Sequence, residues 1–189
     1  MEKIGIYGGT FDPVHHAHLI LAREALERLQ LDEVIFVPAA MSPHKLDGTP
    51  TDSAARLAML QAAIEGEPRF SVDEIELQRP PPSFTIDTIE SYVGASADTE
   101  IHYLLGSDNL PRLHTWHRFA ELERLVRFVV LNRGAKIVAC PYEIVERQID
   151  ISATEIRNRV ATGRSIRYLV PPAVEEIIRR RQLYTEPTR

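Results

Sequence analysis

The sequence has almost no cysteine and no long hydrophobic run. Cys140 is the only cysteine among 189 residues, which excludes an internal disulfide and a cysteine cage for zinc and fits a reducing compartment. The longest apolar run, Val34 to Met41, contains Pro38 and is much shorter than the roughly 18 residues that a membrane span requires. The N-terminus has no basic region, apolar core or cleavage site typical of a secretory signal. These absences predict a cytoplasmic protein that makes no contact with a membrane.

The residues that are present are those of a folded protein. Hydrophobic residues make up 44% of the chain and charged residues 26%, close to the usual globular mixture, which excludes a disordered chain. A chain of this length can bury a sufficient hydrophobic core without disulfides or a structural metal. We therefore expect residues 1–189 to form a single domain.

Charge is distributed unevenly along the chain. The net charge of −5 argues against a general nucleic-acid coat protein, and we expect no nucleic-acid partner. Residues 152–189 nevertheless contain eight arginines and four acidic residues. Such a basic section on an acidic body indicates either a local anion site or a solvated helix face.

Short apolar runs alternate with amphipathic segments. Buried strands are predicted at Ile4–Tyr7, Val34–Val37, Phe70–Leu77, Ile101–Leu105 and Phe128–Leu131. Helices are predicted from Leu19 to Leu31, from Asp52 or Ser53 to Ile64, and at Thr85–Tyr92, Ala153–Ala161 and Pro172–Arg181. The segment Ala39–Thr51 is expected to be a loop. This alternation predicts an α/β fold whose parallel sheet is covered by helices on both faces.

The turn after the first predicted strand has the features of a phosphate site. Gly8 and Gly9 let backbone N–H groups approach a phosphate closely, and the N-terminal end of the next helix points toward the same space. The spacing of His15 and His18 places both imidazoles on one side of a first helical turn, whereas His16 should face elsewhere. A Gly-Gly turn alone is common, and the histidines could equally be surface residues or metal ligands. The dinucleotide and Walker A fingerprints are both absent.

A second cluster lies near the C-terminus. Ser152 is a natural helix N-cap, and Glu155 three residues later completes the pattern of a capping box. This structural reading does not explain Arg157, because its positive charge opposes the helix dipole so early in the helix. The guanidinium is better explained by an anion, which arginine can bind bidentately.

The two motifs together resemble a known family. GGTFDPVHHAH near the N-terminus and ISATEIR near the C-terminus are similar to the (H/T)xGH and ISxTxxR signatures of the nucleotidyltransferase superfamily. Within it, the chain resembles the bacterial nicotinate-mononucleotide adenylyltransferases over essentially its full length. Further matches are SPHK at 42–45, PSFT at 82–85, GSD at 106–108 and Thr115-Trp116.

The resemblance implies a fold, a reaction and a phosphate site. The fold is a doubly wound parallel sheet of the dinucleotide-binding type, and residues 152–184 would complete its ATP phosphate site. The reaction joins nicotinate mononucleotide to ATP, with Mg²⁺ carried on the nucleotide, and releases pyrophosphate. The implied catalytic residues are His15, His18, Lys45 and Arg157. The implied ATP- and phosphate-binding residues are Gly8, Gly9, Thr10, Phe11, His44, Gly106, Asp108, Ser152 and Thr154.

The resemblance also implies a nicotinate pocket formed by Thr85, Trp116 and His117. An indole face attracts a pyridinium cation, although simple core packing would explain Trp116 as well. Asp108 could instead cap a helix that begins at Leu110. The chain departs from the family pattern twice, with Ala17 where Gly is usual and His117 where Tyr is frequent.

Three alternatives remain open for the function. A related adenylyltransferase acting on 4′-phosphopantetheine would keep the chemistry, but that family more often has Thr in place of His15 and a shorter chain. A non-catalytic nucleotide sensor would not need His15, His18, Lys45 and Arg157 together, because a mere binder requires no transition-state donors. A nucleic-acid-binding module is disfavoured by the overall acidity. A homo-oligomer is compatible with the sequence.

Overall fold

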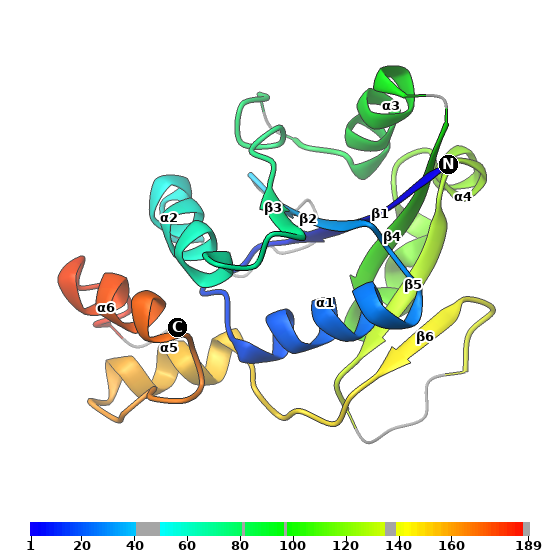
Figure 1. The fold of residues 1–189 in the computed structure, drawn as a ribbon. Helices are drawn as coiled ribbons and strands as arrows, with labels where there is room; N and C mark the ends of the chain where they lie inside the picture. The colour runs from blue at the N-terminus through cyan, green and yellow to red at the C-terminus, as the bar shows by residue number, and fades with distance from the viewer. Residues whose placement is uncertain (41–49, 81, 97, 135–138, 187–189) are drawn as a thin grey trace.

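The sheet contains six parallel strands in the order β3-β2-β1-β4-β5-β6 (Figure 1). This computed structural model describes residues 1–40, 50–80, 82–96, 98–134 and 139–186. The strands are β1 (Glu2–Gly9), β2 (Glu33–Pro38), β3 (Phe70–Val72), β4 (Thr99–Gly106), β5 (Arg127–Asn132) and β6 (Glu143–Glu146). Every neighbouring pair is parallel, which confirms the predicted parallel sheet.

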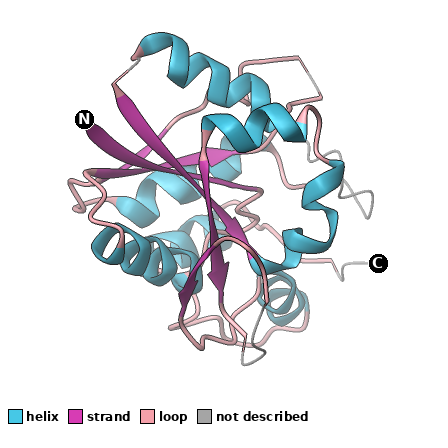
Figure 2. Cartoon of the chain, turned by 90° about the vertical axis from the view of Figure 1, so that its right-hand side faces the viewer, coloured by secondary structure: helices cyan, strands magenta, loops and turns pink. Residues whose placement is uncertain are grey.

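Helices cover both faces of the sheet (Figure 2). The helices are α1 (His16–Arg28), α2 (Ser53–Ile64), α3 (Thr85–Ala95), the 3₁₀ helix η1 (Ser107–Thr115), α4 (Phe119–Leu125), α5 (Ala153–Ala161) and α6 (Pro172–Arg180). Successive side chains of β1 enter different cores, because side chains alternate across a strand. Tyr7 packs in the core built with α1, α2, α5 and α6, whereas Ile6 packs in the core built with α3, η1 and α4. The fold is therefore doubly wound, as predicted.

The strand order reverses direction between β1 and β4. From β1 the chain proceeds outward to β2 and β3 and then crosses back to β4, from which it continues to β5 and β6. The carboxyl ends of β1 and β4, at Gly9 and Gly106, consequently lie side by side with helices departing on opposite faces. Such a switch point leaves a crevice in which α/β proteins bind ligands.

The predicted strand Phe70–Leu77 is too long, because β3 ends at Val72. The Asp73 carboxylate accepts a hydrogen bond from the backbone N–H of Ile75 at 2.9 Å, and the backbone N–H of Leu77 donates to the carbonyl of Glu74. An aspartate that bonds to the backbone two residues later stabilises a turn instead of a strand. The strand β6, the helix α4 and the 3₁₀ helix η1 were not predicted.

One buried arginine joins two loops at the carboxyl edge of the sheet, the β1–α1 loop and the β2–α2 connection. Arg56 of α2 is 1% exposed and donates hydrogen bonds to the carbonyl oxygens of Thr10 (2.8 Å), Ala39 (2.9 Å) and Thr51 (2.9 Å). These carbonyls belong to the loop after β1, the loop after β2 and the segment before α2. Because a buried carbonyl without a partner is costly, Arg56 determines how these loops pack together. None of the helices in the described part of the chain has the length and apolar character of a membrane span.

We expect Arg56→Met to lower the free energy of unfolding by about 3 kcal/mol, because it leaves three part-buried backbone carbonyls without their donor. Urea unfolding at pH 7 measures this difference. Arg180→Met is the matched control, since the Arg180 side chain is 75% exposed and its ion pair with Glu176 contributes little. Equal losses in the two variants would contradict the structural role of Arg56.

Candidate active site

The two glycines at the end of β1 face opposite sides of the sheet. A Cβ on Gly8 would collide with the hydroxyl of Tyr103, and a Cβ on Gly9 would come within 2.9 Å of the Phe11 ring. Both positions therefore require glycine because the protein's own aromatic side chains fill the space beside them. The sequence reasoning attributed these glycines to the approach of a phosphate and did not identify this packing.

His15 and His18 form a stacked pair at the start of α1. His15 is the N-cap and His18 the third residue of the helix, and their ring centroids lie 3.7 Å apart with 19° between the planes. The backbone N–H of His15 donates to Nδ1 of His18 at 3.2 Å. Tyr7 and Phe11 contact the His18 ring edge-on. The sequence spacing correctly placed the two imidazoles on one side of the first turn.

The two histidines have different protonation constraints. Burial, together with the nearby positive charge of Arg133, lowers the pKa of His15 to about 3, so its imidazole is neutral near pH 7. Its side chain faces the backbone N–H of His18 in a capping-box arrangement, and its buried Nδ1 atom makes no hydrogen bond of normal geometry with the described residues. His18 uses Nδ1 as an acceptor, so its ring proton must lie on Nε2, which is therefore a donor.

The motif at α5 connects with the loop after β1. Ser152 is the N-cap of α5, and its hydroxyl accepts a hydrogen bond from the backbone N–H of Glu155 at 3.1 Å, as predicted. The Glu155 carboxylate forms an ion pair with Arg159. The Arg157 guanidinium donates to the carbonyl oxygen of Asp12 at 2.7 Å and to the hydroxyl of Thr154 at 3.3 Å. Arg157 thus lies against the loop that leads to the two histidines.

Arg133 is a site residue that the sequence reasoning missed. It follows β5 directly and donates to the carbonyl oxygen of Ile151 at 2.9 Å, which joins the end of β5 to the start of the second motif. Its charge lowers the pKa of His15, as stated above, and also opposes the rise in the Tyr7 pKa that burial causes. Its position at the carboxyl end of a predicted strand was the available signal.

A second group of side chains lies on the α3 side of the sheet. The hydroxyl groups of Thr85 and Tyr103 are 3.5 Å apart, and Trp116 contacts the Tyr103 ring edge-on with centroids 5.8 Å apart. The His117 ring packs on Phe84 with centroids 4.4 Å apart. The structure therefore brings the three predicted pocket residues, Thr85, Trp116 and His117, around the N-terminus of α3. Tyr103, which links two of them, was not identified from the sequence.

Gly106 and Asp108 lie at the end of β4, next to the glycines of β1. The Asp108 carboxylate occupies the space that a side chain at position 106 would need. The 3₁₀ helix already begins at Ser107 with Gly106 as its N-cap, so Asp108 does not cap a helix at Leu110. The predicted site residues His44 and Lys45 lie outside the described residues.

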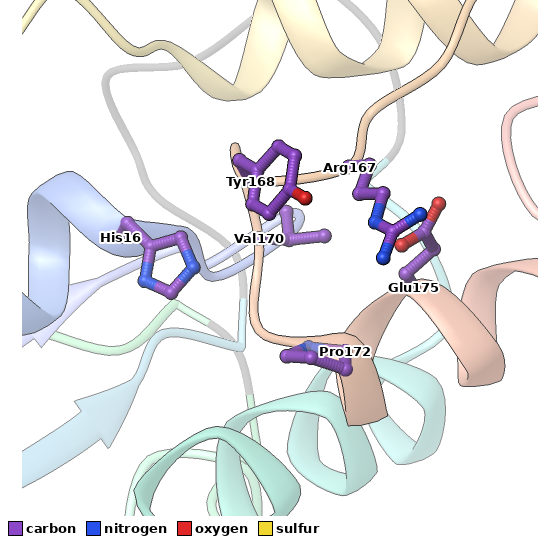
Figure 3. A pocket seen from close by; sticks show the side chains of 6 residues that line it. All are labelled: His16, Arg167, Tyr168, Val170, Pro172 and Glu175. Carbon is purple, nitrogen blue, oxygen red and sulfur yellow. The ribbon is translucent and has the colours of Figure 1, made fainter.

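His16 turns away from the histidine pair, as the sequence predicted. It lines a surface pocket whose other walls come from the segment before α6 and from α6 itself (Figure 3). The backbone N–H of His16 donates to the carbonyl oxygen of Leu169 at 3.0 Å. The lining residues are His16, Arg167, Tyr168, Val170, Pro172 and Glu175.

Comparison with known proteins gives a consistent assignment. Residues 6–159 match the family model described as cytidylyltransferase-like. A Geobacillus thermodenitrificans protein named "Probable nicotinate-nucleotide adenylyltransferase" is 44% identical over 187 residues, which cover 97% of this chain and 87% of the relative. A Thermomicrobium roseum protein of the same name is 43% identical over 199 residues, with 97% and 92% covered.

Solved structures agree in fold. The nicotinic acid mononucleotide adenylyltransferase of Plasmodium falciparum, in complex with NaAD, superposes with a TM-score of 0.84 at 19% identity over 98% of each chain. The complex of the Plasmodium enzyme with APC gives a TM-score of 0.82 at 18% identity. The chain belongs to the cytidylyltransferase-like family of nucleotidyltransferases. Within that class it is a member of the nicotinate-nucleotide adenylyltransferase family.

The depressed pKa of His15 links stability to pH. The unfolded chain binds a proton at His15 near pH 6.5, whereas the folded chain does so only near pH 3. The contribution of His15 to stability is therefore complete above about pH 6.5 and declines as the pH falls toward 3. The pKa of His102 is lowered by burial as well, so this histidine acts in the same direction.

We expect His15→Gln to reduce the loss of unfolding free energy between pH 7 and pH 4.5 by about 1–2 kcal/mol relative to the unmodified chain. Urea unfolding at the two pH values provides the measurement. His16→Gln is the control and should keep the full pH dependence. The assignment would be wrong if both variants lost stability on acidification as steeply as the parent chain.

Proposed function

We propose that the site transfers the adenylyl group of ATP to nicotinate mononucleotide. A phosphate oxygen of the mononucleotide attacks the α-phosphorus of ATP in line, and the bond from the α-phosphorus to the bridging oxygen breaks as pyrophosphate leaves. The main observation in favour is the stacked pair of His15 and His18, which contacts Phe11, the ring that packs beside Gly9 at the end of β1. No residue needs to act as a nucleophile, because the mononucleotide phosphate is itself the attacking group.

We assign the stabilisation of developing charge to the phosphate side of the site. The Nε2–H group of His18 is the donor that would contact the α-phosphoryl group, since Nδ1 is already used as an acceptor. The His15 ring, stacked on His18 at the start of α1, would lie beside the same phosphate. Fixed neutral donors need no reorganisation when charge develops in the transition state.

The β- and γ-phosphates are assigned to the second motif. Ser152, Thr154 and Arg157 lie at the N-terminal turn of α5, where the helix dipole favours an anion. Thr10 and the backbone of Gly8 and Gly9 would bind phosphate from the opposite side. The family resemblance assigns Lys45 and His44, which lie outside the described residues, to the same phosphates.

The nicotinate ring is assigned to the cluster on the α3 side. The indole of Trp116 offers an aromatic face to the pyridinium ring, and Thr85 and His117 flank it. The N-terminus of α3 has no side-chain hydrogen bond from its N-cap, Phe84. The backbone N–H groups of the first turn of α3 would favour a carboxylate over an amide, because a helix N-terminus attracts negative charge. This feature supports nicotinate mononucleotide over nicotinamide mononucleotide.

Mg²⁺ belongs to the nucleotide substrate in this proposal. Within the described part of the chain, no group of three or more His, Cys, Asp or Glu side chains is arranged to hold a metal ion. The ion would enter as Mg·ATP and neutralise charge on the pyrophosphate that leaves.

Pyrophosphate release from Mg·ATP tests the substrate directly. We expect turnover with nicotinate mononucleotide to exceed that with nicotinamide mononucleotide by at least about tenfold in kcat/KM, because only the former carries a carboxylate on its pyridinium ring for the α3 N-terminus. Activity with 4′-phosphopantetheine alone would support adenylyl transfer but would contradict nicotinate mononucleotide as the substrate. Measurable ATP binding without turnover of any of the three compounds would indicate a nucleotide sensor.

We expect His18→Ala to lower kcat by about 100-fold or more while changing the dissociation constant of Mg·ATP by less than about threefold. The reason is that the Nε2–H donor gains most of its interaction energy in the transition state. Steady-state kinetics and isothermal titration calorimetry measure the two quantities. His16→Ala on the opposite side of the helix is the control and should retain activity. Equal losses of rate and binding in His18→Ala would refute the assigned role.

A further inference from the structure

Asp12 connects the C-terminal segment to the phosphate side of the site. It lies in the loop between β1 and α1 and is 9% exposed. One carboxylate oxygen accepts a hydrogen bond from the hydroxyl of Tyr184 at 2.6 Å, and the other accepts one from the backbone N–H of Thr51 at 3.1 Å. The backbone carbonyl of the same residue accepts the hydrogen bond from Arg157 at 2.7 Å.

Through these contacts, three distant segments of the chain meet at Asp12. Tyr184 follows α6 and is 172 positions from Asp12, whereas Arg157 is 145 positions away. The α6 helix packs against α2, which lies beside it in Figure 1. Tyr184 itself packs against the hydrophobic core on the α1 side. Its hydroxyl is therefore held in place by packing at one end and by a carboxylate at the other.

The hydroxyl of Tyr184 remains a donor throughout the working pH range. Burial and the adjacent carboxylate of Asp12 both raise the pKa of Tyr184 far above that of a free tyrosine. The charged and titratable groups near this hydroxyl include Asp12, Arg157 and Arg56. A donor that keeps its proton fixes the orientation of the Asp12 carboxylate and thereby of its peptide group.

We propose that Tyr184 is a positioning residue that acts through Asp12 on Arg157. The Asp12 carbonyl oxygen directs the Arg157 guanidinium, and Tyr184 with Thr51 holds the Asp12 carboxylate so that this carbonyl keeps its direction. The C-terminal segment thus helps to align the Arg157 guanidinium with the terminal phosphates of ATP. This inference rests on the proposed role of Arg157 in phosphate binding.

Loss of the Tyr184 hydroxyl would leave a carboxylate oxygen of Asp12 without its donor in a site that is only 9% exposed. The carboxylate would turn to find another donor or water, since a buried unpaired acceptor is unfavourable. The peptide of Asp12 would follow, and the Arg157 guanidinium would lose its fixed direction. A small displacement of a group that binds the reacting phosphates reduces the rate considerably.

The first test is Tyr184→Phe in the full-length chain, with Tyr168→Phe as the matched control. Tyr168 loses the same hydroxyl but is 78% exposed and lies outside the proposed machinery. We expect Tyr184→Phe to lower kcat/KM for Mg·ATP by about tenfold and to leave KM for the mononucleotide unchanged. Tyr168→Phe should match the unmodified chain. An unchanged kcat/KM for Mg·ATP in Tyr184→Phe would overturn the proposal.

A double-mutant cycle with Arg157→Ala separates positioning from general stability. If Tyr184 acts through Arg157, Tyr184→Phe should change kcat/KM for Mg·ATP by less than about twofold once the guanidinium is absent. The same tenfold loss in both backgrounds would overturn the proposal, because the tyrosine would then act independently of Arg157. Asp12→Asn alters the same hydrogen bond from the other side. Its effect on kcat/KM for Mg·ATP should therefore be non-additive with that of Tyr184→Phe.

The dissociation constant of Mg·ATP, measured by calorimetry without mononucleotide, keeps this inference distinct from the proposed function. A chain that fails to turn over nicotinate mononucleotide would contradict the proposed substrate. In that case the double-mutant cycle would use the dissociation constant of Mg·ATP in place of kcat/KM. Coupling between Tyr184 and Arg157 in that affinity supports the positioning role, and strictly additive effects reject it.

Discussion

The Arg56 guanidinium lies almost completely inside the protein and donates hydrogen bonds to the carbonyls of Thr10, Ala39 and Thr51. The β1–α1 loop and both ends of the β2–α2 connection are thereby fixed relative to α2. Because burial is costly for a charge, the site tolerates Arg56 only while all these acceptors remain in place. The same hydrogen bonds fix the position of the β1–α1 loop, which contains Asp12 and leads to the histidine pair.

On the phosphate side of the site, the imidazoles are neutral and the neighbouring arginines carry the positive charge. The imidazole of His15 is held neutral by burial and by the positive charge of Arg133, and His18 accepts a backbone hydrogen bond that fixes its tautomer. The cations Arg133 and Arg157 instead anchor to backbone carbonyls at Ile151 and Asp12. Permanent positive charge therefore surrounds a pair of neutral, oriented rings. This combination suits a reaction in which negative charge moves between phosphates without a covalent enzyme intermediate.

The alternation of side chains along β1 separates the two groups of site residues. Gly8 faces Tyr103 and the cluster of Thr85 and Trp116, whereas Gly9 faces Phe11 and the histidine side. A strand whose last two residues are glycines thus places one group on each face of the sheet, beside the switch point between β1 and β4. The aromatic rings that fill the space beside these glycines also hold the site residues in place.

The sequence by itself determined what depends on local periodicity and capping. It predicted the buried strands, a cap of α2 at Asp52 or Ser53, the cap of α5 at Ser152 and the shared side of His15 and His18, because each depends on residues within a few positions. The edge strand β6 gave little apolar signal, and the Asp73 turn competed with strand formation. Only the tertiary structure decided the roles of Arg56, Tyr103 and Tyr184. The partners of these three residues lie far along the chain. Each side chain is buried or part-buried, where a polar group without a hydrogen-bond partner is too costly. Burial therefore decides which distant atoms must bond to one another.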